Sequence, residues 1–190
     1  MTHRFTAPLQ RISAKGGSHL AVVPQDVADE LRGGERRGRV VVTLASPDGA
    51  ESVTWHAGLN PYGGGKFYVQ VGRNYHEPLG YAVGDELPLA LRRDTSTYGM
   101  QPCEEFVAVA ESDPEGERLL RECFTAGTQR TLLHRIAAGR TSDARIERAV
   151  RVFDQLHLGV RDRATLLAVL RKRPAGDAEL GGLDVPEDFA

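Results

Sequence analysis

The sequence contains little cysteine, and its two thiols, Cys103 and Cys123, do not form a C-x-x-C pair. No histidine stands near them at zinc-finger spacing, so neither a disulfide framework nor a zinc site is predicted. Two isolated thiols suit a reducing compartment, where they behave as small apolar side chains. We predict no metal site and no cofactor.

Long apolar runs are also missing. The stretch 1–17 lacks the apolar core of about seven residues or more that a secretory leader needs. Nowhere do about 18 apolar residues follow one another, the length that a membrane-spanning helix requires. We therefore expect a cytoplasmic protein without membrane insertion.

Neither sign of charge dominates the sequence. The chain of 190 residues has 24 Lys and Arg against 26 Asp and Glu, for a formal net charge of −2. This balance excludes a disordered acidic chain. The apolar residues, 41% of the total, are enough for a globular core.

The first half of the sequence alternates apolar and polar residues, which is the period of a β-strand with one buried face. Pro8 and Pro88 lack the N–H that a central strand uses, so each is expected where pairing is incomplete. The pattern predicts a split β-barrel. Its six strands are expected around Phe5–Leu9, Leu20–Val23, Arg39–Leu44, Val53–Leu59, Phe67–Val71 and Leu87–Leu91.

After Asp94 the apolar period becomes that of a helix. Asp113 is predicted to start one helix, and the group Thr141, Ser142 and Asp143 to precede another, because their side-chain oxygens can accept from free first-turn N–H groups. The second of these helices has an apolar stripe formed by Ile146, Ala149, Val150, Phe153 and Leu156.

Together these patterns predict an α+β protein. A small split (double-split) six-stranded β-barrel is expected at 1–96, three to four amphipathic helices at 97–174, and an acidic, flexible tail at 175–190.

Five stretches of the sequence carry a family resemblance. They are VVPQDVADEL (22–31), RGRVVVTL (37–44), LNPYGGGKFYV (59–69), VGDELPLALRRD (83–94) and LLHRIAAGRTSDARIERAV (132–150). They resemble a bacterial family of unknown function that joins an N-terminal double-split barrel domain to a helical segment labelled YdeI/OmpD-associated, or bacteriocin-protection-like. The resemblance implies that fold over about residues 4–158, and it implies no reaction. At His76 and Ser142 the family usually has arginine, so a role that those arginines have in other family members is not expected in this protein.

One predicted hairpin and the turn after it carry aromatic and basic side chains that suit a small anion or a peptide. The candidate ligand-binding residues are Tyr62, Lys66, Tyr68, Arg73, Tyr75 and His76. The alternative is structural, with Tyr68 on the solvent side of a strand and Tyr75 packing the turn. Glycines precede Lys66, but the Ser or Thr and the helix of a phosphate loop do not follow, so Asn60–Gly65 is predicted to be a hairpin loop.

Charge is uneven along the helical part. Residues 101–117 hold six acids and no base, whereas residues 118–173 hold 13 bases and five acids. Helical spacing places Arg145, Arg148 and Arg151 in one row, and Arg135 and Arg140 precede it. A helix-turn-helix outline makes nucleic-acid binding by these arginines the alternative function. A solvated face, or one that neutralises the acidic stretches, would give the same spacing.

No acid, base and nucleophile converge in the sequence, so no catalytic residue is predicted and no enzyme is expected. The histidines lack metal-ligand spacing; His134 and His157 are expected to be partly buried, and His56 to point outward from its strand. The sequence thus predicts a non-catalytic binding or accessory protein with a role in stress. Its partner would be a small anion or a protein.

Overall fold

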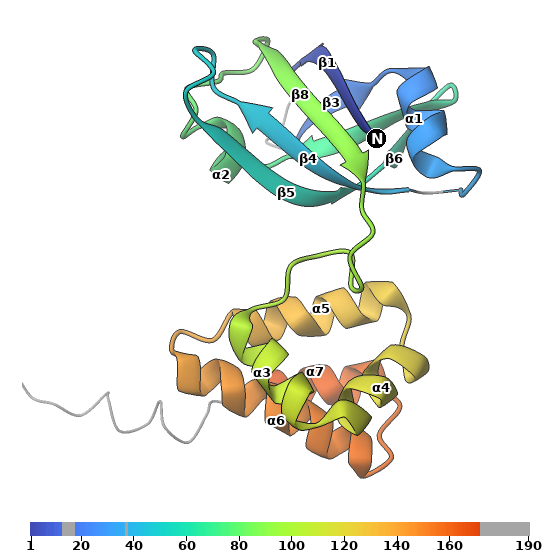
Figure 1. Ribbon diagram of the computed structural model, residues 1–190, viewed down its shortest axis with the longest axis vertical. Helices are drawn as coiled ribbons and strands as arrows, with labels where there is room; N and C mark the ends of the chain where they lie inside the picture. Colours follow the sequence, from blue (N-terminus) through green and yellow to red (C-terminus); the bar gives the residue numbers. More distant parts are fainter. Residues whose placement is uncertain (13–17, 37, 172–190) are drawn as a thin grey trace, which may run out of the picture. The chain divides into compact units, whose positions relative to one another are not determined.

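The computed structural model describes residues 1–12, 18–36 and 38–171. It confirms the α+β class. The chain divides into two compact units, of which unit 1 is Met1–Met100 and unit 2 begins at Gln101 (Figure 1). The acidic tail predicted at 175–190 lies outside the described residues.

Unit 1 contains two antiparallel sheets of four strands each. Sheet A has the strand order β1 (Thr2–Pro8), β8 (Glu86–Arg93), β4 (Arg39–Ala45) and β5 (Ser52–Gly58). Sheet B has the strand order β2 (Gln10–Arg11), β3 (His19–Val23), β7 (Lys66–Val71) and β6 (Asn60–Gly63).

The architecture differs from the prediction in the number of strands. The described strands form two separate sheets with no closed barrel, and there are eight of them where six were predicted. The added strands are β2 and β6. Asn60–Gly63 was expected within a loop, but it pairs with β7 before the chain turns at Gly64.

Both predicted interruptions of pairing are present. Pro8 lies on β1, an edge strand of sheet A. Pro88 lies on β8 just beyond Leu89, where the pairing with β4 stops. Because β4 does not pair with β8 at Pro88, the N–H that proline lacks would have no hydrogen-bond partner on that side of β8.

The core of unit 1 lies between the sheets. Sheet A contributes the fully buried Val40 and Val42, and sheet B contributes Val69 and Val71 to the same cluster. Helix α1 (Gln25–Arg32) adds three buried side chains, Val27, Ala28 and Leu31. The single-turn helix α2 (Arg73–His76) follows β7.

Unit 2 has five helices within the described residues. They are α3 (Glu104–Ser112), α4 (Pro114–Cys123), α5 (Ala126–Ala137), α6 (Ser142–His157) and α7 (Arg163–Arg171). Asp113 accepts from the backbone N–H of Gly116, which confirms that cap. Of the three residues predicted to precede the other helix, Thr141 is the cap and accepts from Ala144 N–H, so that α6 already begins at Ser142. None of the described helices is long and apolar enough to span a membrane.

The apolar stripe predicted on α6 is only partly buried. Ala149, Phe153 and Leu156 are buried, but Ile146 and Val150 are each 40% exposed. The Phe153 ring packs edge-on against Phe106 of α3, with 5.8 Å between centroids. The periodicity identified the apolar side of α6, but two of its five predicted residues remain exposed.

Candidate functional site

The six predicted ligand-binding residues do not lie in one place. Tyr62, Lys66 and Tyr68 lie on the β6–β7 hairpin of sheet B. The rings of Tyr62 and Tyr68 touch edge to face, with 5.9 Å between centroids, and the Tyr62 hydroxyl donates to Gln10 Oε1 at 3.4 Å. The other three residues lie beyond the far end of β7, roughly 17 Å along the strand at about 3.3 Å per residue.

These other three residues lie on α2. Tyr75 stacks on Trp55 at 4.4 Å between centroids, which is the packing role considered as its alternative. Arg73 is exposed and forms an ion pair with Glu77. His76 is only 3% exposed, so it belongs to the interior of unit 1.

His76 forms a buried histidine pair with His19 that the sequence analysis missed. A carbonyl oxygen only accepts, so His76 Nδ1 donates to Tyr81 O at 3.0 Å, and its Nε2 lies 3.3 Å from His19 Nδ1. Burial lowers the pKa of His19, and the charge of His76 lowers it further. The sequence did indicate that His19 is buried. His19 alternates with Ala21 and Val23 along β3, and because both of these face the core, His19 faces it too.

The expectation for two other histidines is corrected. His134 and His157 are both exposed, not partly buried. His157 Nε2 instead meets Asp113 Oδ2 at 2.7 Å on the surface of unit 2. Helical periodicity placed these residues beside apolar stripes, but a residue at the margin of a stripe can still face solvent.

The most organised polar group in the structure surrounds Asp94, directly after β8. Its side chain is fully buried and accepts hydrogen bonds from His56 Nδ1 at 2.9 Å and from Ser96 Oγ at 2.6 Å. Burial raises the pKa of Asp94, but the hydrogen bonds from Ser96 and His56 outweigh it and hold the pKa below its usual value. Asp94 is therefore a carboxylate at neutral pH.

This carboxylate orients His56. Because Asp94 only accepts, Nδ1 carries the hydrogen, and Nε2 points away from the carboxylate. The His56 side chain is 22% exposed. Its position on β5 alternates with the buried Trp55 and Ala57, so it faces outward as predicted.

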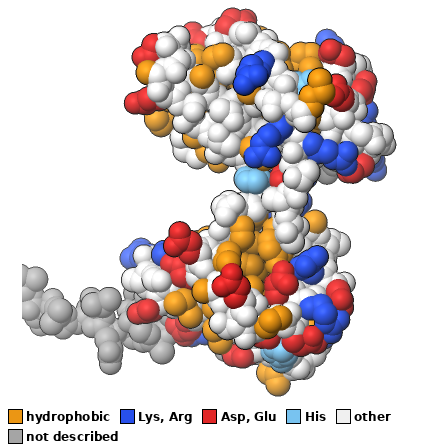
Figure 2. Space-filling view, viewed as in Figure 1, with side chains coloured by type: hydrophobic (Ala, Val, Ile, Leu, Met, Phe, Trp, Pro, Cys, Tyr) orange, Lys and Arg blue, Asp and Glu red, His pale blue; other side chains and the backbone are white. Residues whose placement is uncertain are grey.

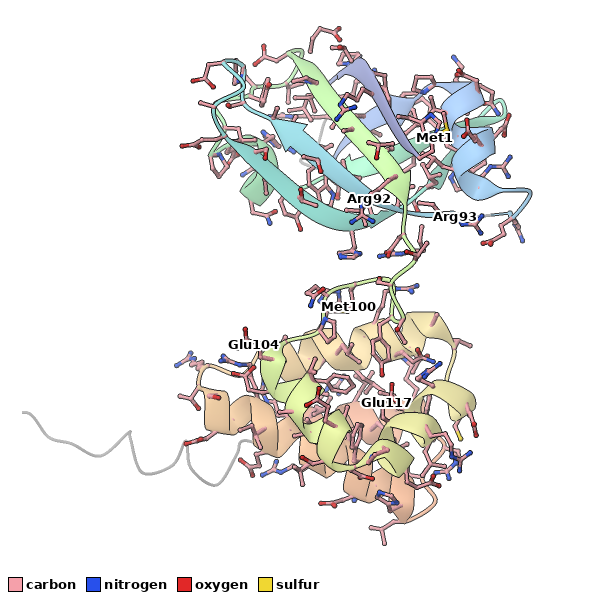
Figure 3. All side chains as sticks on the ribbon, in the orientation of Figure 1. Met1, Arg92, Arg93, Met100, Glu104 and Glu117 are labelled. Carbon is pink, nitrogen blue, oxygen red and sulfur yellow. The ribbon has the colours of Figure 1, made fainter. Side chains whose placement is uncertain are left out.

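Basic side chains gather at the same end of sheet A. Val41 of β4 lies opposite both His56 and Arg92, so these three residues form one row across the sheet. Arg39 is the next outward residue of β4; its Nε lies 4.0 Å from Asp94 Oδ2, and its guanidinium donates to Gly99 O. Figure 3 labels Arg92 at the C-terminal end of β8. We call Arg39, His56 and Arg92 the basic end of sheet A.

A shallow hollow of about 450 Å³ lies on the same face. The inner strands carry small side chains there, Ala45 on β4 and Pro88 and Ala90 on β8. Arg4 of β1 lies opposite Ala90, one row from Arg92, and stands at the side of the hollow. The hollow therefore has a largely apolar floor, and Arg4 is the one charged residue among the described residues that line it. Its lining consists of Arg4, Phe5, Thr6, Thr43, Ala45, Pro88, Leu89 and Ala90.

The predicted arginine row lies on α6, and much of its charge is already engaged. Arg145 forms an ion pair with Glu105, and Arg151 with Glu147. Arg148 donates to the carbonyl of Arg135. The pair with Glu105 agrees with neutralisation of the acidic stretch 101–117, whereas Glu147 and Arg135, the partners of Arg151 and Arg148, lie outside that stretch. Arg135 and Arg140 are exposed, and their use for nucleic acid stays a prediction.

Potential metal ligands and thiols are dispersed in the described part of the chain. No group of three or more His, Cys, Asp or Glu side chains there is placed to hold a metal ion. Cys103 and Cys123 are free thiols.

Comparison with known families identifies one region of the chain. Residues 5–91 match the family described as domain of unknown function (DUF1905). No curated protein matches the chain significantly. The matched region contains most of both sheets and includes Arg39 and His56, whereas Arg4 and Arg92 lie just outside it. Most of unit 1 is thus similar to a domain of unknown function.

Proposed function

We propose that this protein is a non-catalytic binding protein whose sheet A holds a small organic anion. The observation that carries the proposal is the hollow of sheet A, with its small apolar floor residues and the two arginines, Arg4 and Arg92, beside it. The proposed ligand site lies on sheet A, whereas the sequence predicted a site on the β6–β7 hairpin and α2.

The charges at the C-terminal end of β8 favour an anion, whereas Glu86 lies at the opposite end of the same outward row. Within the described residues, Arg4 and Arg92 have no carboxylate partner, and the one buried acid, Asp94, is already bound to His56 and Ser96. A planar guanidinium binds a carboxylate or phosphate through two parallel hydrogen bonds. The apolar floor would cover the hydrocarbon part of such a ligand.

Two observations support binding without catalysis. His56 and Asp94 form an oriented pair, but no hydroxyl or thiol in the described part of the chain hydrogen-bonds to His56. The nearby Ser96 hydroxyl donates to Asp94 instead. Within the described residues this pair therefore has no protein nucleophile to activate, and its outward ring nitrogen is available to a ligand.

Further parts of the proposal rest on the sequence alone. These are the cytoplasmic location, the accessory role in stress, and the relation of residues 132–150 to the YdeI/OmpD-associated segment. Nucleic-acid binding by the α6 arginines is the alternative. Phosphates would have to displace Glu105 and Glu147 from Arg145 and Arg151.

Calorimetric titration with hexanoate tests the proposal, with hexanol as the neutral isostere and hexylamine as the cation. We expect hexanoate alone to bind. Loss of one charge-assisted hydrogen bond costs about 1.5–3 kcal/mol, so Arg92→Ala should weaken binding about tenfold or more.

Arg73→Ala is the matched control, because Arg73 is exposed and lies on α2. It should leave the hexanoate Kd unchanged. Equal binding of hexanol and hexanoate, or equal weakening by Arg73→Ala and Arg92→Ala, would overturn the proposal.

A further inference from the structure

A second surface, on unit 2, has the form of a docking groove between α3 and α6. One arginine–carboxylate ion pair and one histidine–carboxylate contact join these helices, and we call both ion pairs. Arg145 Nη2 meets Glu105 Oε1 at 2.5 Å near their beginnings, and His157 Nε2 meets Asp113 Oδ2 at 2.7 Å near their ends. The helices therefore run in the same direction. The ion pairs hold their ends together, and small side chains occupy the space between.

The groove between the two ion pairs is largely apolar and has a volume of about 410 Å³. The exposed Ile146 and Val150 of α6 form one wall, and the small side chains of α3 form the other. Exposed apolar side chains that adjoin in this way are typical of an interaction surface. The lining consists of Ala108, Val109, Ser112, Asp113, Ile146, Val150, Phe153 and Asp154.

The margin of the groove is acidic. Asp113 and Asp154 belong to its lining. Glu104 lies on the same side of α3 as Ala108, one turn away, and residues 101–117 contain six acids and no base. Figure 2 shows apolar side chains with Asp and Glu among them on the displayed face of unit 2. The basic Arg145 is already neutralised by Glu105.

We propose that this groove docks an amphipathic helix of a protein partner, with basic residues beside its apolar face. The ion pairs lie eight residues apart on α3, which is about 12 Å or two helical turns. That length fits apolar anchors at positions i, i+4 and i+7 of a partner helix. Lysine or arginine beside these anchors would meet Asp154 and Glu104. The acidic margin disfavours an anionic membrane as the occupant.

Fluorescence anisotropy with the full chain and a labelled 14-residue Leu/Lys peptide of helical periodicity tests this proposal. The comparison peptides are a scrambled sequence of the same composition and a Leu/Glu peptide of the same pattern. We expect only the patterned Leu/Lys peptide to bind. The double variant Ile146→Ser/Val150→Ser should weaken it about tenfold or more, because it removes most of the exposed apolar wall. Asp154→Asn should weaken it by a smaller factor.

Two control variants match these changes. Leu158→Ser removes a more exposed apolar side chain outside the groove, and Glu51→Gln removes an exposed acid in unit 1. Both should leave the peptide Kd unchanged. Because Ile146 and Val150 are already partly exposed, the double variant should keep the wild-type helicity in circular dichroism.

Three results would overturn the proposal. The first is no binding of the patterned peptide. The second is equal binding of the scrambled peptide, which would show attraction by charge alone. The third is a concentration-dependent dimer, seen by sedimentation and lost in the Ile146→Ser/Val150→Ser variant, because a second copy of the chain would then occupy the groove.

Discussion

The two units use arginine in opposite ways. On α6, Arg145 and Arg151 form ion pairs with carboxylates of their own unit, so their charge is largely neutralised within the fold. On sheet A, Arg4 and Arg92 have no such partner among the described residues, and the nearby carboxylate, Asp94, is occupied by His56 and Ser96. The comparison shows that the placement of acids, more than the number of arginines, decides which cations remain available for a ligand.

The largest expected effect concerns how unit 2 is held together. Phe153 is 1% exposed and packs on Phe106, so Phe153→Ala should lower the free energy of unfolding by about 3–5 kcal/mol. Urea unfolding followed by circular dichroism measures this loss. A loss no larger than that caused by Arg145→Met would mean that ion pairs, and not the core, hold unit 2 together.

A smaller effect is expected at the carboxylate of unit 1. Asp94→Ala removes hydrogen bonds to a buried charge and should destabilise unit 1 by about 2 kcal/mol. It should also weaken hexanoate binding, because His56 loses the group that orients it. Unfolding curves and calorimetry on the same variant check both effects. Unchanged stability together with unchanged affinity would contradict the role given to Asp94.

The buried histidine pair predicts a pH dependence. The pKa of His19 is lowered in the folded state, so the unfolded chain binds the proton more tightly. The stability that neutral His19 contributes is complete above its unfolded pKa of about 6.5 and is lost as the pH falls through the folded pKa. We expect the wild-type Tm to fall between pH 7.5 and 5.5.

The variant His19→Gln should flatten this profile, whereas His134→Gln, at an exposed site, should leave its slope unchanged. Thermal melts at several pH values measure both. Parallel profiles for wild type and His19→Gln would show that the pair does not titrate with folding.

The ion pair of unit 2 should have a smaller effect that appears in acid. The hydrogen bond from Arg145 lowers the pKa of Glu105 to about 2. The stability from this pair is therefore present above the unfolded pKa of about 4.3 and lost as the pH falls toward 2. Arg145→Met should lower Tm slightly at pH 7, and this difference should shrink below pH 3. A constant difference would assign the effect to packing.

The smallest effect is expected with nucleic acid. Because the charge of Arg145 and Arg151 is engaged, labelled duplex DNA should show little binding in anisotropy, even at about 50 mM salt. Strong binding that falls steeply at about 200 mM salt, and that is lost in Arg145→Ala/Arg148→Ala, would instead favour the alternative function.

Features set by local sequence were predictable. The alternating strands, the change to helical period after Asp94, and the caps at Asp113 and Thr141 depend on residues close in the chain. Even the two prolines indicated where pairing stops, because the missing N–H is a local property.

Features set by long-range register were not predictable. His56 and Asp94 are 38 residues apart in sequence and meet only because β4 pairs with both β5 and β8. Likewise, the stripe on α6 marks an apolar side but does not show that α3 leaves Ile146 and Val150 uncovered. The aromatic and basic residues near Tyr62 and Arg73 are close in sequence, but the length of β7 separates them.

Arginine side-chain NMR during a hexanoate titration tests the central claim most directly, because Nε–Cζ signals report each guanidinium separately. The account predicts that the signals of Arg4 and Arg92 shift together with hexanoate, while those of Arg145 and Arg151 stay in place. Shifts confined to Arg145 and Arg151, or equal shifts at all four, would contradict the claim that sheet A carries the available cations.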